Sequence, residues 1–388
     1  MIEQATIKLL EYCARNDWSG YDPYDGLNSP VFAGLLRHRS KLARLILIQC
    51  MKHSPVNCRP FLRVPKESNP KGLALFVSAL LKLSHAGVCV GRDTIVLLLN
   101  RLCASKAPGC PHFCWGYNFD WQARHFLACK GTPNIICTTF VGNAFLDAYS
   151  RYHDRFYLDI AMSAGHFLLY GLQRTQDNHG ICFSYTPSDF EQVHNANLLG
   201  STFLARLHQM TAEEIFLECS IAAARFSIAR QRGDGSWRYG EGRKQTWIDN
   251  FHTGYNLVAL HHLCRYTGRR DWWENIRRGF DFYRSHFFTR EGLPRYYHNR
   301  LYPIDTHALA QSLVTLIELK HLNESNLDLA LTVCQWAIRH MQNFQGYFYY
   351  QKGRLIKNRI PYMRWSQAWM LYALAHLREA LIARDSNE

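Results

Sequence analysis

One pattern recurs along this chain at a nearly constant interval. Segments that open with polar residues and continue with apolar ones begin at positions 138, 194, 252, 307 and 365, at intervals of 55 to 58 residues. Apolar residues at helical spacing fill most of the sequence between them, and strand-like alternation is nearly absent. One such interval accommodates two helices of about four to five turns plus two loops. The repeat therefore constrains the fold to a series of helical hairpins.

A second marker runs in phase with the first. A glycine followed by aromatic residues closes each hairpin, and the intervals between these glycines are 54 to 57 residues. Two markers with one period make a chance repeat implausible, and an earlier hairpin follows from segment 71–83 and its partner after Gly91. The four glycines of the marker are Gly180, Gly235, Gly292 and Gly346.

About six hairpins can form an open solenoid or a closed ring. An open solenoid needs polar caps at both ends, and the first and last repeats show none clearly. We therefore predict an all-α fold, an (α/α)6 toroid, as one domain over 1–388 with less regular helices in 1–70 and repeated hairpins in 71–388. We expect helices near 3–16, 32–53, 71–87, 92–106, 135–151, 155–175, 190–208, 212–232, 247–267, 270–287, 304–321, 325–343 and 361–384.

The polar starts of the repeats predict a binding mouth. In a ring all inner helices run the same way, so their N-termini meet at one end, and that end carries partial positive charge. A histidine beside a carboxylate is suited to acid–base work near neutral pH. The predicted catalytic residues are Asp249, His252, Tyr255, Asp305 and His307.

Aromatic, amide and basic residues near the same helix starts are candidates for substrate binding. Aromatic rings stack on sugar faces, polar groups bond hydroxyls, and an arginine in the mouth suits a carboxylate or phosphate. The predicted binding residues are Trp115, Tyr117, Asp120, Trp121, Tyr185, His194, Asn195, Trp237, Tyr239, Asn250, Arg364, Trp365 and Gln367.

Plain structural roles compete with these assignments. Asp249 and Asn250 are ordinary helix caps, the polar residues near His194 also satisfy a helix start, and the 115–122 segment is equally a packed loop. His194, His252 and His307 occupy equivalent repeat positions, which raises a zinc site as an alternative. We predict no metal and no cofactor, because nothing in the sequence shows that the three imidazoles converge.

Composition narrows the partners. Lysine and arginine number 45 against 31 acidic residues, a net charge of +14 that favours anionic partners. The basic residues run along the chain with denser spots at 37–44 and 265–278, and no nucleic-acid motif accompanies them. The longest apolar stretches are too short to span a bilayer, no signal peptide is visible, and 13 scattered cysteines fit reduced thiols. We expect a cytoplasmic protein without a transmembrane segment, for which peripheral membrane contact stays open.

Two resemblances add to this interpretation. Segment 222–237, with Gln231 and Trp237, resembles the glutamine–tryptophan motif that joins hairpins in squalene and other terpene cyclases, but their aspartate-rich Asp-x-Asp-Asp segment is absent. Segments 115–122, 183–187, 250–256 and 362–369 resemble a bacterial prenyltransferase-like or squalene-cyclase-like group associated with surface-polysaccharide loci. Segment 247–257 is faintly similar to glucuronyl C5-epimerases, which also contain an α/α toroid.

These resemblances imply glycan assembly or modification. The leading hypothesis is a carbohydrate-active enzyme of bacterial polysaccharide biosynthesis, of epimerase, lyase or hydrolase type, acting on an anionic sugar or glycan. Its partners would be a sugar, a glycan or a lipid- or nucleotide-linked saccharide, together with other polysaccharide-synthesis proteins. The alternatives are a terpene cyclase or prenyltransferase-like enzyme with an isoprenoid substrate, and a non-catalytic glycan-binding or scaffolding protein.

Overall fold

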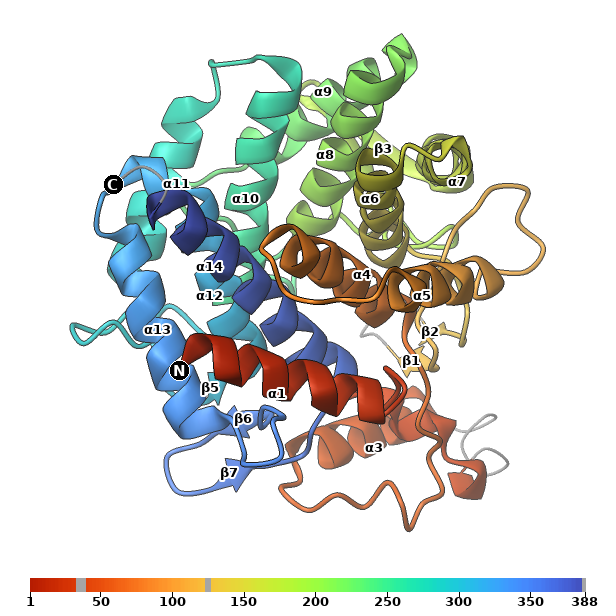
Figure 1. Ribbon diagram of the computed structural model, residues 1–388. Coiled ribbons are helices and arrows are strands. Elements are labelled where there is room, and N and C mark those ends of the chain that lie inside the picture. Colours follow the sequence, from red (N-terminus) through yellow and green to blue (C-terminus); the bar gives the residue numbers. More distant parts are fainter. Residues whose placement is uncertain (33–39, 123–126, 386–388) are drawn as a thin grey trace.

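The computed structural model describes residues 1–32, 40–122 and 127–385 (Figure 1). Helices dominate it, and the strands are short. The helical elements are α1 (Ile2–Arg15), η1 (Asp25–Asn28), α3 (Lys41–His53), α4 (Pro70–His85), α5 (Arg92–Ala104), α6 (Ile135–Tyr152), α7 (Arg155–His166), η2 (Phe167–Gly171), α8 (His194–Thr211), α9 (Glu214–Ile228), α10 (Asn250–Thr267), α11 (Trp273–His286), α12 (Thr306–Glu318), η3 (Lys320–Leu322), α13 (Asn326–Met341), η4 (Met363–Ala368) and α14 (Trp369–Asp385).

The strands form three small antiparallel sheets in the loops. They pair as β1–β2, β3–β4 and β5–β6–β7. Their presence differs from the sequence expectation of an almost strand-free chain, because the aromatic loops are stiffened by short ladders. The strands are β1 (Trp121–Gln122), β2 (Leu127–Ala128), β3 (Arg174–Asp177), β4 (Gly180–Phe183), β5 (Ile304–Asp305), β6 (Gln351–Lys352) and β7 (Lys357–Asn358).

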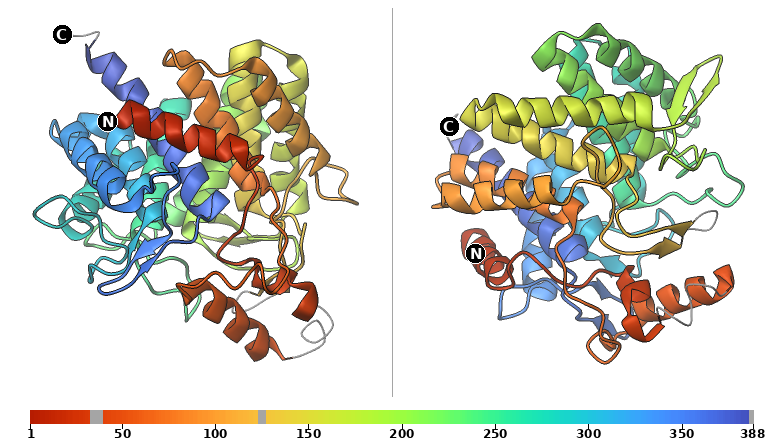
Figure 2. Two further views of the ribbon diagram at one scale, coloured as in Figure 1. Left: turned by 60° about the horizontal axis from the view of Figure 1, so that its bottom comes forward. Right: turned by 90° about the vertical axis from the view of Figure 1, so that its right-hand side faces the viewer.

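Six inner helices close into a ring. In order around it, α4, α6, α8, α10, α12 and α14 each contact the next, and α14 returns to contact α4. Helices α5, α7, α9, α11 and α13 each pack outside the inner helix that precedes them, and α1 packs on α14 (Figures 1 and 2). The predicted (α/α)6 toroid is therefore confirmed. The contact of α14 with α4 closes the inner ring, and the N-terminal helix α1 packs outside the C-terminal helix α14.

The glycine marker shows how each repeat meets the next. A Cβ on Gly180, Gly235 or Gly346 would overlap the backbone of α9, α11 or α1 respectively, and each glycine has a positive φ. Gln231 Nε2 donates to the carbonyls of Gly235 and Asn275, at 2.9 and 2.8 Å. Gln342 repeats this geometry on Gly346 and on Ala5 of α1, at 2.8 and 2.9 Å. The same device thus fastens successive hairpins and closes the ring.

Caps place the N-termini of the inner helices at one end, which we call the mouth. Asn69 and Asn134 accept backbone N–H groups of α4 and α6 in their side chains, and Asp249 and Asp305 do so for α10 and α12. Several helices begin or end away from the expected positions: α7 gives way at residue 167 to a π-type turn and then to β3. The N-terminal half of the predicted helix 32–53 falls largely outside the described residues, and α3 begins at Lys41.

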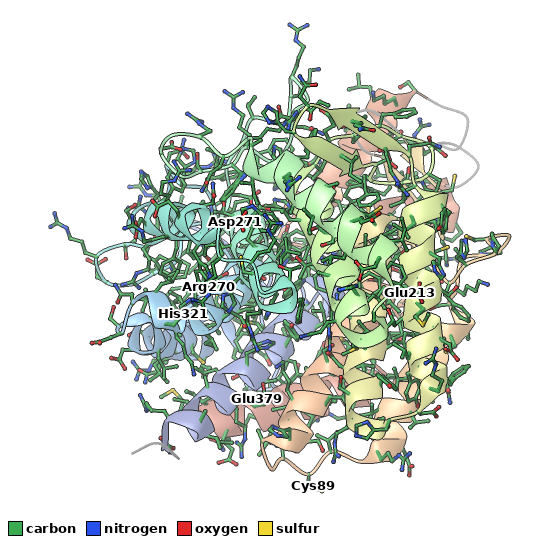
Figure 3. The ribbon with its side chains drawn as sticks, turned by 90° about the horizontal axis from the view of Figure 1, so that it is seen from above. Cys89, Glu213, Arg270, Asp271, His321 and Glu379 are labelled. Carbon is green, nitrogen blue, oxygen red and sulfur yellow. The ribbon has the colours of Figure 1, made fainter. Side chains whose placement is uncertain are left out.

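The opposite end, where the inner helices lead into the outer ones, is the closed end (Figure 3). Cys89, Glu213, Asp271 and His321 lie in four of its short connections. Within the ring near this end, charged side chains of neighbouring inner helices pair with one another. The pairs are Lys82–Glu379 at 2.8 Å, Arg206–Asp147 at 2.6 Å, and Glu318 with both His262 and His376 at 3.4 Å.

Among the described residues, none of the helices combines the length and apolarity that crossing a bilayer requires.

Candidate functional site

A narrow crevice, which we call the hollow, lies at the mouth between the starts of α8 and α10 and is too tight in this structure to admit a water-sized molecule. The loop 237–247 forms its wall, and the rings of Tyr239 and Trp247 stack there with centroids 4.3 Å apart. A second depression lies at the end of α4 near Arg92 and holds none of the predicted site residues. The mouth hollow is lined by Asn195, Trp237, Arg238, Tyr239, Trp247, Asp249, His252, Thr253 and Asn256.

An aspartate–histidine pair faces this hollow. Asp249 is buried, and its Oδ1 accepts the backbone N–H of His252 at 3.0 Å. Its Oδ2 accepts from Trp247 Nε1 at 3.0 Å and from His252 Nδ1 at 2.8 Å. An ionised carboxylate only accepts, so Nδ1 carries the proton and Nε2 is the acceptor nitrogen. The cap of α10 thus also orients His252 as a base.

Two buried amide oxygens line the same hollow without a partner. Asn195 Oδ1 and Asn256 Oδ1 make no hydrogen bond with any described residue. Buried polar atoms are nearly always satisfied, so an orphan acceptor in a hollow calls for a ligand or water that donates to it. Two amide oxygens beside an imidazole suit a molecule carrying several hydroxyl groups.

A tyrosine–histidine pair lies next to the hollow. Tyr255 OH and His307 Nε2 are 2.6 Å apart, and both side chains are buried. The rings of His252 and Tyr255 have centroids 6.0 Å apart, so the two pairs are neighbours. Burial lowers the pKa of His307 well below its usual value, and the positive charges of Lys71 and Arg364 lower it further. His307 is therefore neutral, and burial raises the pKa of Tyr255 well above its usual value, so the Tyr255 hydroxyl keeps its proton and can donate a hydrogen bond to His307 Nε2.

Aromatic rings fix the position of His307. Phe251 and Trp369 stack on its two sides at 4.5 Å each, and Trp365 meets it edge-on at 4.7 Å. His307 Nδ1 is buried and has no partner among the described residues. The ring is therefore held by packing while one of its nitrogens stays unsatisfied.

Asp305 caps α12 beneath this cluster. Its Oδ1 accepts the backbone N–H of His307 at 2.8 Å, and its Oδ2 accepts from Gln351 Nε2 at 2.7 Å. Trp365 Nε1 donates to both oxygens at 3.1 and 3.2 Å. Burial raises the pKa of Asp305 to about 6, although the bonds from Gln351 and Trp365 lower it. These three donors make Asp305 a positioning group for His307 and Trp365.

Lys71 is a site residue that the sequence analysis missed. It lies on the first turn of α4, is buried, and makes no hydrogen bond or ion pair with the described residues. Its Nζ lies 4.3, 5.2 and 5.4 Å from the ring centroids of Phe140, Trp369 and Tyr255. Burial, together with Arg364, lowers its pKa to about 7. The available signal was a single lysine at an inner-helix start, followed by an apolar run.

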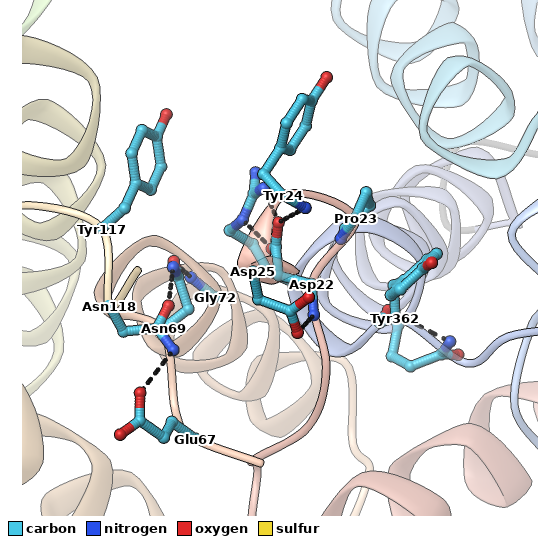
Figure 4. Close-up of polar contacts among 12 residues, drawn as sticks. Asp22, Pro23, Tyr24, Asp25, Glu67, Asn69, Gly72, Tyr117, Asn118 and Tyr362 are labelled. Atoms are coloured by element: carbon cyan, nitrogen blue, oxygen red, sulfur yellow. Dashed lines mark hydrogen bonds and ion pairs between the residues drawn. The ribbon is translucent and has the colours of Figure 1, made fainter. Parts of the chain in front are cut away.

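Arg364 is held by an aspartate that the sequence analysis did not single out. Its Nε and Nη2 donate to the two oxygens of Asp22, at 2.6 and 2.8 Å. Asp22 lies beside Asp25, which accepts from Arg59 Nε at 2.6 Å (Figure 4). The carboxylate of Asp22 compensates the charge of Arg364. Lys71, which has no such partner among the described residues, is therefore the better candidate for the anion-binding role predicted for Arg364.

A second aromatic wall stands across the mouth. Tyr117 OH and Tyr185 OH are 3.1 Å apart, and Trp121 meets Tyr117 edge-on at 6.0 Å and Tyr185 at 5.5 Å. Arg364 lies 5.3 Å from the Tyr117 ring. The neighbouring Asp120 accepts the backbone N–H of Lys130 at 2.7 Å and so closes its own loop.

Five predicted binding residues have polar groups engaged inside the hairpins, although Asn250 Nδ2 is buried without a partner among the described residues. Trp115 is fully buried and donates to Leu102 O at 2.7 Å, and Trp237, although it lines the hollow, donates to Ser227 O at 2.8 Å. The other three bonds are His194 Nε2 to Glu241 Oε1 at 2.9 Å, Tyr283 OH to Asn250 Oδ1 at 2.9 Å, and Phe348 N to Gln367 Oε1 at 2.7 Å.

Across the described parts of the chain, no group of three or more His, Cys, Asp or Glu side chains is arranged to hold a metal ion. In particular, His194 bonds Glu241 and Ser227, whereas His252 bonds Asp249 and His307 bonds Tyr255. Each of the three repeat-equivalent histidines thus has its own partners.

Comparison with known proteins identifies the same architecture elsewhere. No protein-family model matches the sequence, and no curated protein matches it. Among solved structures, the GH76 α-mannanase BT2949 of Bacteroides thetaiotaomicron superposes with a TM-score of 0.61 at 12% identity, over 84% of this chain and 90% of that one.

Two sugar-converting enzymes are comparably similar. The cellobiose 2-epimerase of Spirochaeta thermophila gives a TM-score of 0.60 at 13% identity, covering 82% of this chain and 88% of its own. A D-mannose isomerase gives 0.61 at 12% identity, covering 81% and 87%. The TM-scores show that these proteins share the α/α toroid fold with this chain, and at such low sequence identity the similarity extends no further than the fold.

Proposed function

We propose that this protein is a carbohydrate-active enzyme that moves protons on a sugar bound in the mouth. The observation that carries the proposal is the hollow in which the Asp249–His252 pair faces the unpartnered amide oxygens of Asn195 and Asn256. The similar folds that act on sugars, a mannanase, an epimerase and an isomerase, support the substrate class.

The groups at hand favour epimerisation or isomerisation within the set of sugar reactions. Hydrolysis of a glycoside ordinarily uses two carboxylates on either side of the bond. Here Asp249 is occupied by His252 and Trp247, and Asp305 by Gln351, Trp365 and the α12 backbone. The groups left for proton transfer are His252 Nε2 and the Tyr255–His307 pair.

The proposed reaction breaks and remakes one C–H bond. His252 Nε2 takes the proton from the carbon next to the carbonyl of an open-chain sugar, which leaves an enediolate. The Tyr255 hydroxyl donates a hydrogen bond to the developing oxyanion, and the protonated His252 then returns a proton to carbon, which restores both groups. Lys71 supplies the positive charge for the oxyanion or for a carboxylate or phosphate on the substrate. The aromatic wall formed by Tyr239 and Trp247 packs against the apolar face of the sugar ring.

A rival isoprenoid enzyme would need an apolar, aromatic-walled cavity with one deep acid. The hollow does contain three aromatic side chains and the buried Asp249, but two amides, an imidazole and an arginine lie beside them, which suits a polyhydroxylated substrate better. A place in polysaccharide biosynthesis, suggested by the sequence resemblance, remains part of the proposal.

Deuterium uptake tests the proposal directly. The protein is incubated in D2O with free aldoses, uronic acids and nucleotide sugars, and NMR follows exchange at carbon and the appearance of an epimer. We expect exchange with the wild type and none above background with His252→Asn. The matched control is His194→Asn, at the equivalent helix start but bonded to Glu241. Absence of exchange with every substrate, or full exchange in a folded His252→Asn variant, would contradict the proposal.

A further inference from the structure

Two long segments of the sequence contain no acidic residue. Segments 26–66 and 329–378 contain no aspartate or glutamate, and they carry 8 and 7 lysines and arginines respectively. Basic residues also occur elsewhere along the chain, but there they alternate with aspartate and glutamate.

These two acid-free segments meet in space beside the mouth. Asn358 Nδ2 of β7 donates to Ser54 O, just after α3, at 2.9 Å. The guanidinium of Arg59 lies 4.7 Å from the ring centroid of Tyr362. In Figures 1 and 2 the β6–β7 hairpin and α3 lie together at one end of the molecule. We call this surface, formed by α3, the 54–66 loop and the β6–β7 hairpin, the basic face.

Large apolar side chains project from the basic face. Leu355 and Ile356 at the tip of the β6–β7 hairpin are 94% and 63% exposed, and Phe61 in the 54–66 loop is 84% exposed. Leu42 and Ile46, one turn apart on α3, are 65% and 53% exposed. Such side chains on three adjacent elements are unusual for a surface that meets only water.

Exposed cations lie among these apolar side chains. Arg354 and Arg359 flank the hairpin tip, Lys41 begins α3, and Arg63 and Lys66 end the loop, all of them exposed. Acidic residues, which ordinarily alternate with basic ones on a solvated surface, are absent from both segments. The face therefore offers positive charge and protruding apolar groups together.

We propose that the basic face docks on the surface of an anionic lipid bilayer. Cations attract anionic headgroups, and apolar side chains at loop tips enter the boundary between headgroups and acyl chains. An acidic polysaccharide would be attracted by the cations alone and would leave Leu355, Ile356 and Phe61 in water. The combination therefore favours a bilayer over a soluble polyanion.

Docking in this orientation brings the mouth to the membrane. Lys52 of α3 donates to Tyr24 OH at 2.8 Å, and the Tyr24 and Trp365 rings have centroids 5.7 Å apart. Trp365 in turn donates to Asp305 in the mouth. The face thus adjoins the mouth and would present it to a headgroup-linked saccharide. The inference rests on the surface alone and does not require the proposed reaction.

Vesicle binding tests the inference with the full chain. The protein is mixed with vesicles of phosphatidylcholine alone or with about 30% phosphatidylglycerol, and the bound fraction is measured by flotation at several salt concentrations. We expect binding only to the anionic vesicles, weakening as salt rises. Both Arg354→Glu/Arg359→Glu and Leu355→Ser/Ile356→Ser should lower the apparent affinity about tenfold or more.

Matched changes at the closed end serve as controls. Arg270→Glu/Lys320→Glu reverses two exposed charges there, and Phe156→Ser removes an exposed ring on α7; both should bind as the wild type does. The inference is overturned if the wild type does not bind anionic vesicles, or if the hairpin variants bind unchanged. It is also overturned if Leu355→Ser/Ile356→Ser binds normally while the charge variant does not, because a purely electrostatic partner would then suffice.

Discussion

The two ends of the ring are built from the same six inner helices but treat their polar groups differently. At the closed end, Lys82, Arg206 and Glu318 each have a charged or ionisable partner on a neighbouring inner helix. At the mouth, Lys71 has none among the described residues, and Asn195, Asn256 and His307 keep buried atoms without a hydrogen bond. The charged groups of the closed end named above are paired with one another, although His261 Nδ1 and His262 Nδ1 there are buried without a hydrogen bond, whereas the buried amine of Lys71 in the mouth has no charged partner among the described residues.

This difference separates stability from function within one fold. A paired buried charge is costly to disturb, because removing one partner leaves the other uncompensated. An unpaired buried group costs stability while it waits for a ligand, and such groups concentrate at binding and catalytic sites. Substitutions at the two ends should therefore have effects of opposite kind.

The largest effect is expected at the mouth, on activity. His252→Asn keeps a polar side chain on α10 but removes the base, and loss of a general base typically costs about 10²- to 10⁴-fold in rate. Because 21% of the His252 side chain is exposed, the substitution should change the free energy of unfolding of the protein little. Rates of carbon-bound deuterium exchange and urea denaturation curves together check this. A large stability loss with retained rate would reverse the assignment of the two ends.

The next largest effect is expected at the closed end, on stability. Arg206→Met leaves Asp147 with only Ser78 as a side-chain donor among the described residues and should lower the free energy of unfolding by about 1–2 kcal/mol, because the pair is only partly buried. The double variant Arg206→Met/Asp147→Leu should recover much of that loss, since no charge is then left unpaired. Denaturation curves of both single variants and the double variant give the coupling energy. A coupling near zero would show that the pair is not a structural element.

Lys71→Met, like Arg206→Met, replaces a basic side chain with methionine, but here the free energy of unfolding should rise instead of fall. Replacing an unpaired buried amine with an apolar side chain of similar length should raise the free energy of unfolding by about 1 kcal/mol. Turnover should fall at the same time, most for sugars carrying a carboxylate or phosphate. Denaturation at pH 7 and the rates for a neutral and an acidic sugar measure both. A destabilised variant with unchanged selectivity would place Lys71 with the structural groups.

How much of this could be read from the sequence depends on the range of each interaction. The repeat period, the glycine loops and the Asp249–His252 pair depend on neighbours within a hairpin, and all three are visible as local patterns. Arg364 and Asp22 are 342 positions apart, so no local sequence pattern around either residue predicts their pairing. The role of α1 in closing the ring depends on a contact of the same long range.

Burial explains the remaining differences in the candidate site. Trp115 belongs to an aromatic segment typical of sugar binding, yet its indole is fully enclosed against α5. Lys71 is hidden for the opposite reason, since a lone lysine in an apolar helix has no partner in the pattern. Sequence periodicity identifies which helix face is inward, but whether an inward side chain packs or waits for a ligand depends on all six helices together.

The smallest effect concerns pH and again involves the closed end. Burial, with a smaller contribution from His262, lowers the pKa of His261 to about 4 from its usual 6.5. The unfolded chain therefore binds a proton at this position at a higher pH than the folded chain does. The stability contributed by neutral His261 is fully present above about pH 6.5 and is lost as the pH falls toward 4. From pH 7 to pH 5.5 the free energy of unfolding should drop by about 1 kcal/mol through this group.

His261→Phe isolates that contribution. The ring is retained beside Trp273 and His321, whose centroids lie 5.7 and 4.9 Å from that of His261, while the titration is removed. The difference in unfolding free energy between pH 7 and pH 5.5 should then shrink by about 1 kcal/mol relative to the wild type, with exchange activity at pH 7 unchanged. An unaltered pH dependence would mean that protonation of the mouth, at His307, governs acid sensitivity instead. In that case the closed end would contribute neither to the pH dependence of stability nor to catalysis.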